Sequence, residues 1–587
     1  MKRFALTLLI PVFILGFLPS TAGAASSPST SAKYLCLIVL DAGKPEYVTN
    51  HLSQMPTMRS LIAHGRWYDR AWVSSLMSIT PPDHAVIGTG SFPKDDGGIV
   101  NWDWGVHSTG KISPSFQALA NYQNGWAFKV IKDSGTPTLS GLIRQKYPRD
   151  PVIAGSGAHF HAAGPMGGPD ASWIFSYDRI GGSWAPYTLG QHPVPASLLH
   201  DPSLRTPLVG SNHSTVPLTY DPLPIGQQDS LVASFAIQTL QRYRPRAMMI
   251  NLPEPDTIGH WSHQWKRDEG LLYLSFDKDL ARITAAYKQA GIYNQTLFVI
   301  TADHGMIQSQ HRVLDRVAVV NQVKSMVGQQ GTILTNGGGA AGPTMTSMWI
   351  KNPAENARVA KALFAKHYDN VSAIFYIQHR GSHYYYNMAG CEQCPPDLVK
   401  TYRYLLSTEA GPTGEDIGIL LRENARNSGL PQMMGRHGGA DWGSQHVTLV
   451  LSGPGVQDGA SQHPARLADL APTIERFMGI TPKARDGIVL ADAFQNPNLA
   501  DVATQNASDP TMGVYVNSLM QRAQSDILLE RQNKLPNVVT GDEIIIHWKR
   551  RLAVTIAGVV VLIGTAIGLA WAVAEVRRKG TGLNWTA

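Results

Sequence analysis

The sequence predicts an α/β fold in which helices cover both faces of a doubly wound, mostly parallel sheet. Three mainly apolar, strand-like runs support it, two of them rich in β-branched residues, because strands covered on both faces are mostly apolar. The runs span residues 34–40, 247–252 and 296–301. A carboxylate follows each run: Asp41, Asp256 and Asp303. Since ligands of such sheets collect at the carboxyl ends of the strands, this repeated order predicts a site along one edge.

Other segments complete the expected α/β order. Helical segments are expected at 55–64, 136–146, 229–242, 271–290 and 468–479. A short strand is expected at 151–155, and another strand with a turn at 446–455. Residues 156–175 are rich in glycine and are expected to form a loop. This loop carries His159 and His161, to which the sequence assigns no certain role.

The ends of the chain differ in composition from its centre. Lys2 and Arg3, an apolar run and small residues at 22–24 form a secretion signal. Residues 486–548 are polar, with a helix expected at 514–532, and are interpreted as a stalk. The expected parts are a signal peptide (1–24), a linker (25–33), a catalytic domain (34–485) with an insertion (352–430), the stalk (486–548), a transmembrane helix (552–574) and a cytoplasmic tail (575–587).

Residues 552–574 contain no charged side chain. At about 1.5 Å per residue, such a helix crosses a hydrocarbon core of roughly 30 Å. Basic clusters flank it on both sides, which argues against a buried core helix. A cleaved signal followed by a membrane span predicts a single-pass membrane protein whose catalytic domain is exported to the periplasm or the cell exterior.

Net charge and cysteine content further limit the kind of protein that this chain can be. The net charge of +7 comes from cations in the terminal segments, so the exported body is formally neutral. A neutral body offers no electrostatic footprint for duplex nucleic acid. Cys391 and Cys394 are predicted to form a local disulfide in an oxidising compartment, whereas Cys36 lies in an apolar strand and is expected in the core.

Thr80 occupies an unusual corner of the chain. Pro81 and Pro82 follow it and force a turn, and an apolar run with two glycines then indicates a helix start. A hydroxyl at a helix start faces free N–H groups, which suits a nucleophile that attacks a phosphoryl group. Asn101, further along, could donate to a developing oxyanion. An ordinary turn threonine is the alternative for Thr80.

The candidate metal ligands are carboxylates and imidazoles: Asp41, Asp256, His260, Asp303, His304 and His437. Asp256 and His260 are four residues apart and can share one helical face. His446 is a rival for His437, and Asp41 alone could equally cap a helix. Oxygen and imidazole donors without thiolate suit Zn²⁺ or a similar divalent ion. Six such ligands and a hydroxyl divide into two sites, as two-metal phosphoryl transfer requires.

Several motifs occur in a recognisable order between Asp41 and Gly455: LIVLDAG, ITPPDHAVIGTGSFP with GGIVNW, PEPDTIGH, ITADHGM, GRHGG and LSGPG. In these motifs the chain resembles the alkaline phosphatase superfamily, and within it the type I phosphodiesterase/nucleotide pyrophosphatase group. The resemblance implies an alkaline-phosphatase-like fold and a metal-dependent phosphohydrolase that acts on small phosphate esters.

The resemblance also implies roles for the candidate residues. One ion would be held by Asp256, His260 and His437, and the other by Asp41, Thr80, Asp303 and His304. Thr80 would attack phosphorus and form a phosphothreonine, while Asn101 and the Thr80 N–H stabilise the non-bridging oxygen. A sulfatase of similar fold needs a cysteine or serine at this position, so threonine argues against that activity.

The expected substrate class depends on cations near the site. In threonine-dependent monoesterases of this superfamily a Lys-x-Arg pair contacts the doubly charged phosphate. Here residues 150–177 contain no lysine or arginine, which favours a phosphodiesterase/nucleotide pyrophosphatase. His159 or His161 could substitute, so a phosphomonoesterase or a phosphotransferase stays open. A membrane-anchored binding protein with a degenerate site is the alternative from another class.

Overall fold

The computed structural model describes residues 31–99, 105–106, 111–112, 126–190, 192–207, 223–262, 264–308, 312–328, 333–335, 344–350, 352–428, 434–483 and 485–532. The predicted signal peptide, transmembrane helix, cytoplasmic tail and Asn101 lie outside these residues. Among the described helices, none is both long and apolar enough to cross a membrane.

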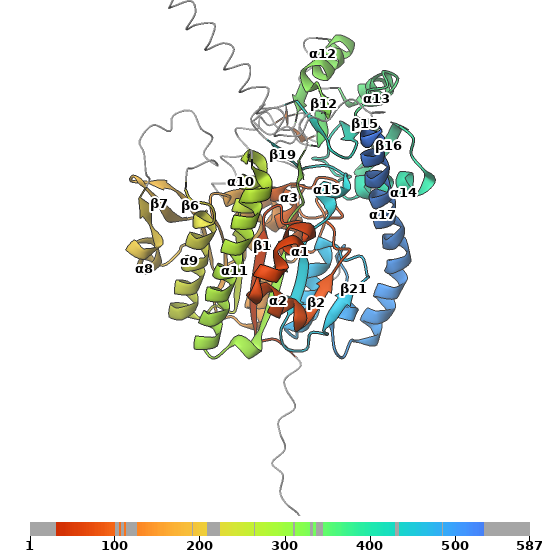
Figure 1. Cartoon of the computed structure of the whole chain (residues 1–587). Coiled ribbons are helices and arrows are strands. Elements are labelled where there is room, and N and C mark those ends of the chain that lie inside the picture. Colours follow the sequence, from red (N-terminus) through yellow and green to blue (C-terminus); the bar gives the residue numbers. More distant parts are fainter. Residues whose placement is uncertain are drawn as a thin grey trace, which may run out of the picture.

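A ten-stranded sheet forms the centre of the molecule, in the order β21-β2-β20-β10-β1-β9-β5-β6-β7-β8 (Figure 1). Its five middle strands are parallel, as the continuous apolar runs predict. They are β10 (Thr296–Thr301), β1 (Tyr34–Leu40), β9 (Ala247–Leu252), β5 (Val152–Ser156) and β6 (Trp173–Ile180).

Strands toward the two edges add antiparallel pairs: β20 pairs with β10 and β2, and β7 pairs with β6 and β8. The sheet is therefore parallel in its centre and mixed at its margins. The outer strands are β2 (Gly65–Tyr68), β20 (Leu449–Ser452), β21 (Gly459–Ser461), β7 (Ser183–Thr188) and β8 (Thr206–Pro207).

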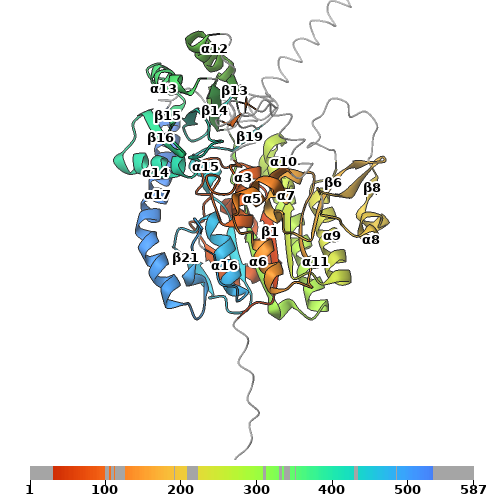
Figure 2. The same cartoon turned by 180° about the vertical axis from the view of Figure 1, so that it is seen from behind.

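Helices cover both faces of this sheet, which Figures 1 and 2 show from opposite sides. One face packs against α1 (Pro45–His51), α2 (Pro56–Ala63), α9 (Gln227–Tyr243) and α11 (Trp265–Gln289). The other face packs against α3 (Thr80–Thr89), α5 (Trp126–Ser134), α6 (Leu139–Lys146), α7 (Phe160–Gly167) and α16 (Leu470–Phe477).

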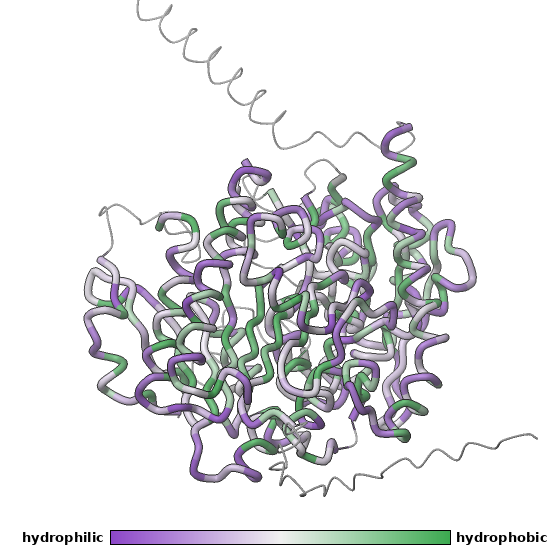
Figure 3. Tube along the Cα trace, turned by 60° about the horizontal axis from the view of Figure 1, so that its bottom comes forward, coloured by the Kyte–Doolittle hydropathy of each residue, from purple (hydrophilic) through white to green (hydrophobic). Residues whose placement is uncertain are grey.

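The residues of β1 explain why the run is apolar throughout. Leu35, Leu37 and Val39 face one core, whereas Cys36 and its alternate neighbours face the other. Cys36 is buried, as expected, and burial raises the pKa of its thiol to about 12. Apolar residues accordingly concentrate along the strands in the interior, with polar residues at the periphery (Figure 3).

The glycine-rich segment 156–175 is not a loop, because α7 occupies residues 160–167. Intrinsic propensity disfavours a helix with internal glycine and proline, but α7 packs closely on α3. A Cβ at Gly88 of α3 would collide with the Met166 backbone of α7. Tertiary packing therefore decides this segment against its local preference.

An inserted five-stranded antiparallel sheet lies at one end of the body (Figure 1). The sequence predicts that the insertion starts at residue 352. The sheet starts earlier in the chain, because β14 pairs with β17. Cys391 at the end of β16 is bonded to Cys394, as predicted. The elements are α12 (Arg316–Val327), β13 (Ile333–Thr335), β14 (Met345–Ile350), α13 (Asn356–Phe364), β15 (Val371–Arg380), β16 (His383–Cys391), α14 (Pro396–Ser407) and β17 (Ile417–Leu421).

The described part of the predicted stalk is a long helix that packs on the body. This helix, α17 (Leu499–Arg531), contributes Met512, Val516 and Leu519 to a core that it shares with α14. Near its end, buried Asp526 pairs with Arg422 at 3.0 Å. The helix expected at 514–532 is thus the second half of a longer one, and it does not extend freely from the domain.

Candidate active site

Three adjacent strands bring the predicted carboxylates together. β1 lies between β9 and β10, and both neighbours run parallel to it. Asp41 follows β1 directly, Asp303 follows β10 after one residue, and Asp256 lies on α10 (Glu254–Trp261), which follows β9. Their meeting at one edge is the arrangement that the sequence predicts. Asp41 does not cap the next helix, since Lys44 holds the N-cap of α1.

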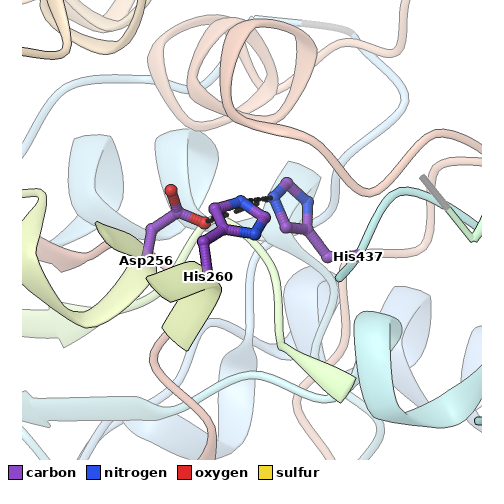
Figure 4. Close-up of side chains that lie close together, drawn as sticks. All are labelled: Asp256, His260 and His437. Carbon is purple, nitrogen blue, oxygen red and sulfur yellow. Dashed lines mark hydrogen bonds and ion pairs between the residues drawn. The ribbon is translucent and has the colours of Figure 1, made fainter. Parts of the chain in front are cut away.

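Asp256, His260 and His437 form one group, here called the outer cluster (Figure 4). Asp256 Oδ1 lies 3.2 Å from Nε2 of each histidine, and the two Nε2 atoms are also 3.2 Å apart. Ligands of a tetrahedral zinc ion, with bonds of about 2.0–2.1 Å, are separated by about 3.3 Å. The three atoms therefore fit a single divalent ion.

Main-chain carbonyls fix the imidazoles of the outer cluster. His260 Nδ1 lies 2.8 Å from Gly435 O, and His437 Nδ1 lies 3.0 Å from Ser78 O. Because a carbonyl only accepts, each Nδ1 carries a proton, so each Nε2 presents a lone pair toward Asp256 when the ring is neutral. Within the described residues, buried Asp256 Oδ1 has no hydrogen-bond partner. Such carbonyl-held imidazoles are typical of metal ligands.

The rival His446 lies elsewhere. Its Nδ1 is 3.2 Å from Glu46 Oε1, its Nε2 is 3.1 Å from Asp69 O, and its ring stacks on Trp442. His437 instead follows β19 (Gly435–Arg436) and faces His260. The structure thus places His437, and not His446, in the outer cluster.

Asp41, Thr80, Asp303 and His304 form the second group, here called the inner cluster. His304 Nε2 lies 3.2 Å from Thr80 Oγ1, 3.4 Å from Asp41 Oδ1 and 3.3 Å from Asp303 Oδ2. Thr80 Oγ1 lies 3.5 Å from Asp41 Oδ1. These separations resemble those of the outer cluster, so the four side chains are candidate ligands of a second divalent ion.

Local contacts orient the inner cluster in the same way. His304 Nδ1 lies 2.9 Å from Gly305 O, so its Nε2 lone pair faces the carboxylates. Asp303 Oδ1 accepts the Ala42 N–H at 3.1 Å, whereas Asp303 Oδ2 lies 3.3 Å from both His84 Nδ1 and His304 Nε2. The ring of His304 stacks on that of His437 at 3.6 Å, so the two clusters adjoin.

Burial and mutual repulsion make the ionised form of Asp303 unfavourable, whereas His159 outweighs burial at Asp41 and lowers the pKa of that carboxyl. Burial, together with the charges of Asp41 and Asp83, raises the pKa of Asp303 well above its usual value. Burial lowers the pKa of His304 to about 3, so this imidazole is neutral and free to ligate. For Asp256, by contrast, burial is outweighed by His260 and His437, which hold its pKa well below the usual value. A cation would relieve the repulsion in the inner cluster.

Thr80 is the first residue of α3, and its side chain is buried at the site. Pro81 and Pro82 fit the first turn because they lack N–H groups that would need partners. The Asp83 N–H donates to Ile79 O at 3.2 Å. The hydroxyl of Thr80 therefore lies at the start of a helix, where first-turn amides can bind an anion.

Three further side chains contact these residues: sequence reasoning missed Asn251 and His84, and it gave His159 no certain role. His159 Nδ1 and Asn251 Nδ2 lie 3.1 Å and 2.9 Å from Asp41 Oδ2. His84 Nδ1 lies 2.9 Å from Thr80 O. Two signals were present: His84 is one helical turn after Thr80, and Asn251 interrupts an apolar strand. The rings of His159 and His161 are 4.8 Å apart, and both side chains are buried.

Family comparison identifies the class of protein. The family described as type I phosphodiesterase/nucleotide pyrophosphatase matches residues 35–396, which include every predicted ligand except His437. The chain belongs to this family, within the alkaline phosphatase superfamily, and is a hydrolase of phosphate esters. A comparison with curated proteins gave no match.

Solved structures share the fold at low sequence identity. Inactive murine ectonucleotide pyrophosphatase/phosphodiesterase 5 in complex with AMP is 14% identical, with a TM-score of 0.50 over 81% of this chain and 99% of that one. Alkaline phosphatase PafA is 15% identical, with a TM-score of 0.57 over 79% and 99%. Phosphonoacetate hydrolase from Sinorhizobium meliloti in complex with phosphonoformate is 16% identical, with a TM-score of 0.50 over 76% and 96%.

Proposed function

We propose that this hydrolase is a two-metal phosphodiesterase or nucleotide pyrophosphatase that acts through a phosphothreonine at Thr80. The contact that carries the proposal is the 3.2 Å approach of Thr80 Oγ1 to His304 Nε2, beside Asp41. Thr80 Oγ1 also lies 3.5 Å from Asp41 Oδ1, so this hydroxyl joins a candidate ligand imidazole to a candidate ligand carboxylate. This contact supports Thr80 Oγ1 as the attacking oxygen of the proposed reaction.

Zn²⁺ is the first candidate for both clusters, and bound divalent ions would supply Lewis acidity and stabilise an ionised hydroxyl. Thr80 Oγ1 then forms a bond to phosphorus while the bond from phosphorus to the leaving oxygen breaks. Water subsequently cleaves the phosphothreonine and regenerates the hydroxyl. The Thr80 amide, and Asn101 outside the described residues, are proposed to donate to a non-bridging oxygen.

The surroundings of Asp41 support a singly charged diester as substrate. A dianionic monoester gains most from fixed arginine or lysine side chains. Residues 150–177 supply none, and the nearest candidate substitute, His159, is already hydrogen-bonded to Asp41. Burial, and then the neighbouring His159, lower the pKa of His161 well below its usual value, so this ring is neutral.

A comparison of two esters tests the substrate class. Bis-p-nitrophenyl phosphate is expected to give a higher kcat/KM than p-nitrophenyl phosphate, with one metal-loaded preparation at one pH. This ratio reports transition-state binding. A monoester preference of tenfold or more, about 1.4 kcal/mol, would overturn the diesterase proposal and favour a phosphomonoesterase.

We also propose that the catalytic domain is exported and anchored by residues 552–574. Support comes from the amino-terminal signal pattern and the uncharged carboxyl-terminal segment. Protease added to intact spheroplasts should degrade the domain, and a chain truncated at 532 should leave the membrane fraction. Protection of the full domain in intact spheroplasts would contradict export.

A further inference from the structure

A chain of buried polar side chains connects the nucleophile to the carboxylate beside it. Ser156 ends β5, Asn251 lies in β9 and His84 lies in α3, and all three are fully buried. Asn251 Nδ2 lies 2.9 Å from Asp41 Oδ2, and Ser156 Oγ donates to Asn251 Oδ1 at 2.6 Å. Because a carboxylate only accepts, these two contacts fix which way the amide points.

His84 continues the chain to Thr80. Its Nδ1 lies 2.9 Å from Thr80 O, which can only accept, so Nδ1 carries the proton. Its Nε2 lies 3.1 Å from Asn251 Nδ2 and accepts the second amide hydrogen. Both nitrogens of a neutral imidazole are then engaged. Although His84 groups with Asp41 and Asp303 as a potential ligand set, it has no lone pair left for an ion.

The geometry points to Asn251 and His84 as positioning residues that set Asp41 and the first turn of α3 together. Asn251 and His159 occupy Asp41 Oδ2, so Asp41 Oδ1 alone faces Thr80 and His304. Asp41 would consequently bind an ion through one oxygen, at a fixed position relative to Thr80. This inference rests on the proposed metal-binding role of the inner cluster.

Zinc affinity, measured by competition with a chromophoric chelator, tests the chain without any substrate. Asn251→Leu keeps the side-chain volume but removes both donors, and should weaken zinc binding by about 10–100-fold, as loss of a ligand-orienting partner does. His84→Asn keeps a donor near Nδ1 and should retain more affinity. Thr239→Val, a buried change in α9 away from the site, is the matched control and should bind zinc like the native chain.

Kinetics separate positioning from general stability. In Asn251→Leu, kcat should fall with little change in KM, whereas the melting temperature of the metal-free protein should stay near that of Thr239→Val. Zinc affinity and kcat within twofold of the native protein would overturn the inference. If Asn251→Leu does not fold, Ser156→Ala carries the test: it frees the amide and should weaken zinc binding several-fold, and an unchanged affinity would equally overturn it.

The two proposals fail in different ways. A native protein that hydrolyses no phosphate ester but loses zinc affinity in Asn251→Leu would contradict the proposed function and support the positioning chain. A native protein that hydrolyses phosphate esters, with an Asn251→Leu variant of unchanged zinc affinity and kcat, would support the proposed function and contradict the positioning chain.

Discussion

The inner and outer clusters hold similar ligand atoms at similar separations, yet the protein holds them differently. The carboxylates and the imidazole of the inner cluster are fully buried, whereas the outer side chains remain 8–10% exposed. Side chains of α3 and β9, and of His159 just before α7, support the inner cluster. Main-chain carbonyls of Ser78 and Gly435 support the outer one.

The two clusters therefore differ in how they are positioned and in how accessible they are to solvent. Folding itself positions the inner cluster, because its supporting side chains belong to the core of the sheet. The outer cluster lies nearer to solvent, which agrees with the proposed departure of a leaving group there. The pKa values of one carboxyl from each cluster also differ. Burial and neighbouring carboxylates raise the pKa of Asp303, whereas His260 and His437 lower that of Asp256.

The largest expected effect comes from the hydroxyl that the inner cluster holds. Thr80→Ala should abolish turnover while leaving the fold and the zinc content nearly intact, because only the attacking oxygen is lost. Thr80→Ser should keep part of the activity. Steady-state assays with the preferred ester measure both variants, and native kcat in Thr80→Ala would show that Thr80 is not the nucleophile.

Replacing one carboxylate in each cluster should change stability in opposite directions. The raised pKa of Asp303 means that its ionised form destabilises the folded, metal-free protein above the ordinary carboxyl pKa. The lowered pKa of Asp256 means that its ionised form stabilises it over the same range. After chelation at pH 7, Asp303→Asn should raise the melting temperature by on the order of a few degrees, and Asp256→Asn should lower it.

Both variants should nevertheless lose activity. Calorimetry of the metal-free proteins, with Asp69→Asn near the surface as a control, measures the two shifts. Shifts of the same sign would contradict the electrostatic distinction between the clusters.

The smallest effect is expected far from both clusters. Cys391 and Cys394 close a loop of only a few residues, so the loop-closure relation limits their stabilisation to about 2 kcal/mol. The double change to serine should lower the melting temperature slightly and leave kcat unchanged. Mass spectrometry of the non-reduced peptide should show the loss of two hydrogens, and two free thiols in exported material would contradict the assignment.

The sequence predicts the centre of the fold well because burial on both faces demands continuous apolar strands. The site carboxylates were predictable for a related reason, since each follows such a strand. In contrast, α7 forms against its local propensity through contact with α3, and α17 packs on α14 through residues whose pattern also suits a free helix. Only the assembled fold decides these two elements.

The supporting side chains depend on strand register. Asn251 reaches Asp41 and Ser156 because β9 pairs with β1 on one side and β5 on the other. The local sequence does not predict that pairing, so from the sequence alone Asn251 is only a polar residue within an apolar strand. His84 is similarly visible as a residue one turn after Thr80, but its contact with Asn251 follows from the packing of α3 on the sheet.

Counting ions in matched variants tests the two-cluster account most directly. After zinc loading and dialysis, elemental analysis should find two ions per native chain, one in Asp256→Asn, one in Asp303→Asn and none in the double variant. Exhaustive chelation should inactivate the native protein, and Zn²⁺ should restore it. An active native chain that contains one ion or none, or two ions retained in either single variant, would contradict the account.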